Sequence, residues 1–116
     1  MTSQLLQQAL AAHQRGDLDQ AEALYREILA VQPDHIDVLS LLGVLCSTRG
    51  DHEQAVSLSA RAVELDSHSA LLYLRLGDAQ MNAERLDAAI ESYRKAMELA
   101  PSMPDAPYHL GNALRL

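Results

Sequence analysis

Apolar residues recur along this chain at intervals of three and four, the spacing that places them on one face of an α-helix. The first such stripe consists of Leu5, Leu6, Ala9, Leu10 and Ala12. Short polar turns separate it from further stripes of the same kind. The pattern predicts seven helices. Four of them cover residues 3–15, 35–49, 69–82 and 85–99. The other three follow a cap residue: one runs from the cap at 17 to about 32, one from the cap at 51 towards 67, and one from the cap at 102 to the last residue.

Glycine and acidic residues mark the turns between these predicted helices. Gly16 and Gly50 can end a helix cheaply, because glycine adopts the left-handed backbone conformation without a steric penalty. Asp17 and Asp51 follow them, each with a glutamine three residues later, which is typical of a helix N-cap. We expect Asp34 to cap the third helix in the same way.

The turn before the sixth predicted helix lacks this glycine. Glu84 stands at the position that Gly16 and Gly50 hold in the earlier turns. A residue other than glycine in the left-handed conformation costs roughly 1–2 kcal/mol. We therefore expect either that Asn82 takes the left-handed role or that this turn is built differently.

The helices form pairs that repeat along the chain, and such a period indicates a repeat architecture. One complete copy of the repeated pattern consists of Tyr73, Leu76, Gly77, Ala89, Tyr93, Ala96 and Pro101. A shift of 34 positions towards the N-terminus reaches Leu39, Leu42, Gly43, Ala55, Ser59, Ala62 and Ser67. Each helix pair has apolar side chains on two sides and cannot bury both alone, so successive pairs must stack.

Small and large residues alternate in this repeat where helices have to meet. Gly43 and Gly77 mark positions at which two helices must cross closely, since a larger side chain would hold them apart. Tyr25 and Tyr93 are expected to fill a larger space between repeats. Ser59 holds the equivalent position in the middle repeat. The sequence therefore predicts an underfilled space there and a looser second helix in that repeat.

These residues resemble the tetratricopeptide repeat, whose consensus is W-x2-L-G-x2-Y, then A-x3-F, then A and P. The resemblance covers the whole chain. It implies an all-α fold, a right-handed superhelical solenoid of antiparallel helix pairs with seven helices. It also implies a single domain, residues 1–116, with repeats at about 2–35, 36–69 and 70–103 and a half repeat at 104–116.

In the family that this chain resembles, the first helix of each repeat lines a concave groove that holds a peptide or a protein segment. The groove positions implied by the resemblance are Leu6, Leu10, His13, Asp37, Leu41, Val44, Leu71, Leu74, Arg75, Asp78, Tyr108 and Asn112. Several of these leucines could instead pack the core, because sequence does not fix the rotation of a helix to one residue. Where relatives bind a peptide's terminal carboxylate with basic residues and asparagine, only Arg75 keeps a charge, so that mode is not expected.

The resemblance implies a non-catalytic scaffold for protein–protein interaction, and two alternatives stay open. Shorter likenesses, in residues 21–29 and 109–114, resemble repeats that precede sugar-transferring or sulfate-transferring domains. The chain could therefore be the substrate-recognition arm of a larger enzyme such as a glycosyltransferase or a sulfotransferase. It could also be a self-assembly module, because the open half repeat at the C-terminus could find its partner on another copy and form a homodimer.

Composition and charge narrow the partners further. The net charge of −7 disfavours nucleic acid, which requires neutralisation of phosphates by basic residues. No apolar run approaches the ~20 residues of a membrane span, and no signal peptide is visible. The single cysteine, Cys46, fits a reducing compartment, so we expect a cytoplasmic protein. No two histidines have the helical spacing of a metal site, and we expect no metal, no cofactor and no enzymatic activity.

Overall fold

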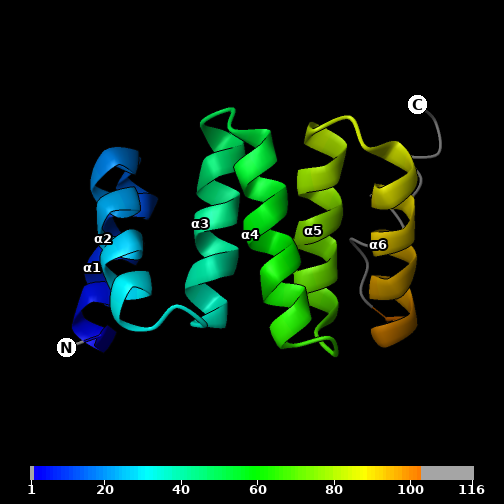
Figure 1. Ribbon diagram of the computed structural model, residues 1–116, viewed down its shortest axis with the longest axis horizontal. Coiled ribbons are helices and arrows are strands. Elements are labelled where there is room, and N and C mark those ends of the chain that lie inside the picture. The colour runs from blue at the N-terminus through cyan, green and yellow to red at the C-terminus, as the bar shows by residue number, and fades with distance from the viewer. Residues whose placement is uncertain (1, 103–116) are drawn as a thin grey trace.

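The computed structural model describes residues 2–102, and over this range the chain forms six α-helices joined by short turns (Figure 1). The helices are α1 (Thr2–Arg15), α2 (Leu18–Val31), α3 (Ile36–Thr48), α4 (His52–Leu65), α5 (Ala70–Asn82) and α6 (Leu86–Leu99). They follow one another across the molecule in chain order as antiparallel pairs. The predicted all-α solenoid is confirmed. The seventh predicted helix lies outside the described residues.

The glycine turns and aspartate caps form as the sequence predicted. Gly16 and Gly50 have φ angles of 82° and 87°, which lie in the left-handed region. The Asp17 carboxylate accepts a hydrogen bond from the backbone N–H of Gln20 at 3.3 Å, and Asp51 accepts one from Gln54 at the same distance. Each turn therefore ends one helix and caps the next within three residues.

The predicted cap at Asp34 is wrong. The cap of α3 is His35, whose Nδ1 accepts a hydrogen bond from the backbone N–H of Val38 at 3.4 Å. The Asp34 carboxylate instead forms an exposed ion pair with Arg61 of α4. Aspartate is the more common cap residue, but α3 begins at Ile36, and this places His35 rather than Asp34 at the cap position.

The turn between α5 and α6 keeps the geometry of the glycine turns although it contains no glycine. Glu84 itself adopts the left-handed conformation, with φ 62°. The following N–H, that of Arg85, donates to the carbonyl oxygen of Gln80 at 2.8 Å. The equivalent bond after Gly16 joins Asp17 to Ala12 at 2.9 Å. The third turn is therefore built like the others, and the chain accepts the steric cost at Glu84.

Replacing Glu84 with glycine should stabilise the protein by up to about 1 kcal/mol. Glycine removes a left-handed penalty of roughly 1–2 kcal/mol, partly offset by the greater freedom that it gives the unfolded chain. The midpoint of urea unfolding, followed by circular dichroism, measures the change. As a control, Gly50→Ala should lose stability, since an added Cβ there has open space and meets only the backbone penalty. A lower midpoint for Glu84→Gly would contradict the assignment of strain.

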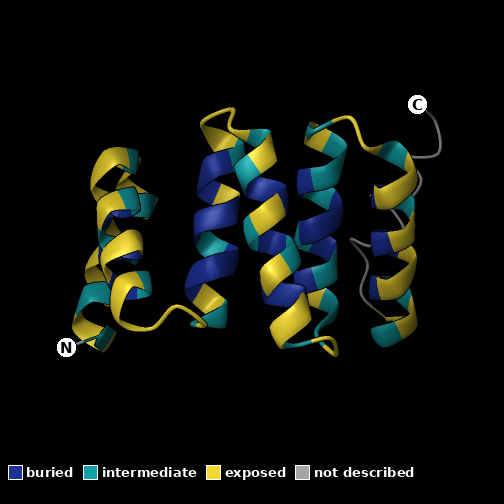
Figure 2. Cartoon of the chain, viewed as in Figure 1, coloured by how far each residue is buried: buried dark blue, intermediate teal, exposed yellow. Residues whose placement is uncertain are grey.

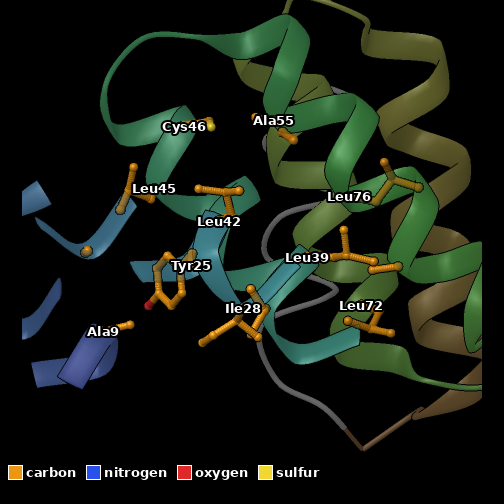
Figure 3. Close-up of a cluster of buried hydrophobic side chains, with 14 of the residues drawn as sticks. Ala9, Tyr25, Ile28, Leu39, Leu42, Leu45, Cys46, Ala55, Leu72 and Leu76 are labelled. Carbon is orange, nitrogen blue, oxygen red and sulfur yellow. The ribbon is translucent and has the colours of Figure 1, made fainter. Parts of the chain in front are cut away.

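A cluster of buried side chains links α1 to α5 across the stacked pairs. It takes Ala9 from α1, Tyr25 from α2, Leu42 from α3, Ala55 from α4 and Leu76 from α5, all labelled in Figure 3. Figure 2 shows that buried positions face neighbouring helices while exposed positions cover the outer faces. Because each pair shares this core with the next, the stack rather than the single hairpin is the stable unit. Within residues 2–102, none of the helices has the length and hydropathy needed to cross a membrane.

Candidate functional site

A hollow of about 470 Å³ opens where the second repeat meets the third. Most of its wall comes from the facing first helices of these repeats, α3 and α5. Single residues of α4 and α6 complete it. The lining residues are Gly43, Val44, Ser47, Thr48, Ser59, Arg75, Asp78, Ala79, Met81, Asn82 and Tyr93.

The hollow lies where the middle repeat lacks a tyrosine. In the third repeat the Tyr93 ring covers Gly77 so closely that an added Cβ would lie 2.5 Å from its Cε1. At the equivalent glycine, Gly43, the nearest atom to an added Cβ is the Oγ of Ser59 at 2.9 Å. A hydroxyl thus replaces a whole ring, and the predicted underfilled space is confirmed. The looseness expected of α4 stays a prediction.

The two tyrosines that are present direct their hydroxyls to residues of the first helices. The hydroxyl of Tyr25 is hydrogen bonded to Nδ1 of His13 at 2.9 Å, and the hydroxyl of Tyr93 donates to Oδ1 of Asp78 at 2.7 Å. Burial raises the pKa of Tyr25, against the opposing effect of Arg75. Burial, and then the Asp78 carboxylate, raise the pKa of Tyr93. Both phenols are therefore neutral structural groups at physiological pH, anchored by two of the predicted groove residues.

Arg75 combines a structural contact with a place in the hollow. Its Nη1 donates a hydrogen bond to Oγ of Ser40 at 2.8 Å, and this bond joins α5 to α3. Ser40 is buried, so the bond satisfies a polar group inside the stack. Among the described lining residues, Arg75 is the one cation and Asp78 the one anion. The formal charges of the lining cancel.

The other predicted groove residues of α1, α3 and α5 differ in exposure. Leu6, Leu10 and Leu41 are half-buried, and each leaves part of its side chain at the surface. Val44 and Leu71 are exposed, at 36% and 45% of their surface. Asp37, at the start of α3, is also exposed.

Leu74 has a packing role, which was the alternative considered for the groove leucines. Its side chain is 7% exposed and belongs to a second core cluster with Ala89, Tyr93 and Ala96 of α6. Leu71, one turn earlier on the same helix, is exposed. The predicted groove residues Tyr108 and Asn112 lie outside the described residues.

The groove positions implied by the family resemblance do not include Thr48 and Asn82, which also line the hollow. Nδ2 of Asn82 donates to Oγ of Ser47 at 3.2 Å and ties α5 to α3 there. Helical spacing could have found them: Thr48 lies four residues after Val44 on the same helix face, and Asn82 is its equivalent one repeat later.

The described residues offer little that resembles catalytic or metal chemistry. Within residues 2–102, no three His, Cys, Asp or Glu side chains gather in a group suited to a metal ion. Cys46 is buried in the core as a free thiol. Its burial raises the pKa of the thiol, which keeps it protonated and weakly nucleophilic at neutral pH. The hollow brings together three of the predicted groove residues, Val44, Arg75 and Asp78.

Comparison with known proteins gives matches along the whole chain. A tetratricopeptide repeat family model matches residues 1–67, and a second model with the same description matches 48–104 and 74–116. Human tetratricopeptide repeat protein 7A is 30% identical over 99 residues, which are 85% of this chain and 12% of that protein. The peroxisomal targeting signal receptor of Saccharomyces cerevisiae is 32% identical over 69 residues, 60% of this chain and 11% of the receptor. The chain thus spans about an eighth of these relatives.

Among solved structures, that of an O-GlcNAc transferase mutant from Thermobaculum terrenum superposes with a TM-score of 0.90. The two chains are 32% identical, and the match covers 97% of this chain and 22% of the transferase. The family models, the helix pairs and the spacing of small residues all indicate the same repeat. The chain belongs to the tetratricopeptide repeat family.

Proposed function

We propose that this chain is a non-catalytic scaffold that binds a peptide or protein segment along the first helices of its repeats. One observation carries the proposal: corresponding residues of α3 and α5 line the same hollow. Val44 and Asp78, Ser47 and Met81, and Thr48 and Asn82 are pairs of equivalent positions 34 residues apart. A surface built from equivalent positions continues from repeat to repeat, and this suits a ligand that is itself extended.

The relatives support a partner of this class. The yeast relative is, by its name, a receptor for a targeting signal. In this proposal residues 1–116 form one array, and the protein is cytoplasmic, because free cysteines are typical of reducing compartments and Cys46 is a free thiol. The groove would include the exposed Val44 and Leu71 and the half-buried Leu6, Leu10 and Leu41.

A second candidate function is favoured by the superposition on an O-GlcNAc transferase. Under it, the same groove presents substrates to the catalytic domain of a larger enzyme. The groove residues are the same in both cases, and the coding sequence around this chain distinguishes them. Self-assembly through residues 104–116 is a separate proposal, and all of those residues lie outside the described range. Light scattering at several concentrations tests it, and a monomer at all of them would contradict it.

We expect a peptide selected from a display library against this chain to lose at least tenfold in affinity when Val44 is changed to glutamate. A buried charge in the apolar part of the groove would oppose binding, and tenfold corresponds to about 1.4 kcal/mol. Isothermal titration calorimetry measures the affinity. Val31→Glu is the matched control, because Val31 is 71% exposed at the end of α2, outside the hollow. Equal losses in both variants, or no selected peptide, would overturn the proposal.

A further inference from the structure

We propose that the hollow beside Gly43 binds an aromatic side chain of the ligand, most favourably a tyrosine. The inference rests on the proposed function and names the anchor residue of the bound segment. The guest ring would occupy the place in the middle repeat that the chain's own tyrosine occupies in the third. The third repeat is therefore the reference for the shape of this place.

The third repeat shows how a ring fits this place. The Tyr93 atoms Cε1, Cδ1 and Cζ lie 2.5, 2.7 and 3.0 Å from the position of an added Cβ at Gly77. The ring therefore rests directly on the glycine backbone of the neighbouring helix. Gly43 offers the same bare backbone in the middle repeat and is part of the wall of the hollow. Ser59 provides only a hydroxyl there, which together with Ala55 and Leu58 covers the α4 side of Gly43, and the rest of the ring's place belongs to the hollow.

The size of the hollow suits a ring. A cavity of about 150 Å³ accommodates benzene in an engineered apolar core, and the hollow here measures about 470 Å³. The hollow lies between α3 and α5, the first helices along which the proposed segment would bind, so a side chain of that segment would enter there. The remaining space would hold the start of that side chain and water.

The lining matches an uncharged aromatic group. Val44, Ala79 and Met81 offer apolar contact, and the thioether of methionine favours contact with aromatic rings. The Arg75 guanidinium adds a cation for the face of a ring. With Asp78 balancing that charge, the lining has no net charge with which to attract an ionic side chain. An aromatic ring is therefore favoured over a carboxylate or an ammonium group.

The hydroxyl of a guest tyrosine also has a candidate partner. In the first repeat the Tyr25 hydroxyl is hydrogen bonded to His13. A side chain that enters between α3 and α5 points the opposite way to Tyr25, so its hydroxyl would meet Ser59 of α4, which lines the hollow and whose Oγ can both donate and accept. This is the reason to expect tyrosine to bind better than phenylalanine.

The first experiment uses p-cresol, the side chain of tyrosine, as the probe. We expect saturable changes in the amide NMR signals of Gly43, Ser47 and Ala79 of the intact chain. Ser59→Tyr, which restores the missing ring, should abolish them. If that variant does not fold, Ser47→Phe fills the hollow from its rim without altering the contact between α3 and α4. No saturable change with p-cresol, or the same changes in a folded filled variant, would overturn the inference.

The second experiment separates this inference from the proposed function. Peptides selected for groove binding should contain an aromatic residue, and its replacement by alanine or the Ser59→Tyr change should each lower affinity at least tenfold. The alanine-substituted peptide should bind the Ser59→Tyr variant no more weakly than either single change predicts, because both changes remove the same contact. Peptide binding that is lost in Val44→Glu but unchanged in Ser59→Tyr overturns the aromatic anchor and leaves the proposed function standing. Binding of p-cresol in the hollow without any peptide binding supports the ring site and counts against the proposed function.

Discussion

Replacing Tyr25 with alanine should cost about 3–5 kcal/mol of unfolding free energy, the range measured for large aromatic residues truncated in a core. The Tyr25 side chain is fully buried between the first and second repeats, where it contacts the core shown in Figure 3. The variant leaves a cavity and removes the hydrogen bond to His13. Because small domains have only about 5–15 kcal/mol of stability in total, much of the chain should unfold at a lower urea concentration.

A second substitution separates the ring of Tyr25 from its hydroxyl. Tyr25→Phe keeps the packing and loses only the hydrogen bond to the half-buried His13, so we expect a loss of about 0.5–1.5 kcal/mol. Urea unfolding followed by circular dichroism gives both values. A Tyr25→Ala protein as stable as Tyr25→Phe would show that the ring does not fill the space between the repeats.

Gly77→Ala should destabilise the protein by about 1–2 kcal/mol. The new methyl group would lie 2.5 Å from Cε1 of the Tyr93 ring, which is itself buried and held by the hydrogen bond of its hydroxyl to Asp78. Overpacking of this kind costs about 1–3 kcal/mol. The better helix propensity of alanine, worth up to about 1 kcal/mol, offsets part of that cost.

Gly43→Ala is the matched control for this prediction. Its methyl group meets the Ser59 hydroxyl at 2.9 Å, and a hydroxyl can rotate away where a ring cannot. The propensity gain then offsets the contact, and we expect a change within about 0.5 kcal/mol of zero. Thermal unfolding of both variants side by side measures the difference. Equal destabilisation of the two would show that the tyrosine ring is not what limits the space at Gly77.

Comparison of Gly43 with Gly77 shows that the middle repeat lacks the stability of a buried ring and has a hollow instead. Burying an aromatic side chain stabilises a fold by about 1.5–3 kcal/mol. With Ser59 the middle repeat forgoes that contribution and leaves a hollow between two groove helices. Tyr25 and Tyr93, on either side of it in the sequence, keep their rings buried. The hollow therefore reduces core packing in the middle repeat, while the tyrosine rings of the first and third repeats stay buried.

The repeat, the helices and most turns could be predicted from the sequence. The reason is local: apolar spacing defines a helix face, and Gly16 and Gly50 adopt the left-handed conformation of a helix-ending turn without a steric penalty. The underfilled place at Ser59 was also predictable, because a repeat supplies its own reference for each position. Comparison of Ser59 with Tyr25 and Tyr93 requires no structure at all.

Tertiary contacts decided what local rules left open. The helix α3 begins at Ile36, which places His35 at the cap, and Asp34 pairs with Arg61 of α4 instead. Leu71 and Leu74 lie one turn apart on α5 and look equivalent in the sequence, yet α6 covers only Leu74. Helical periodicity indicates which face is apolar, but the neighbouring helix determines which residues of that face are covered and which stay open to a partner.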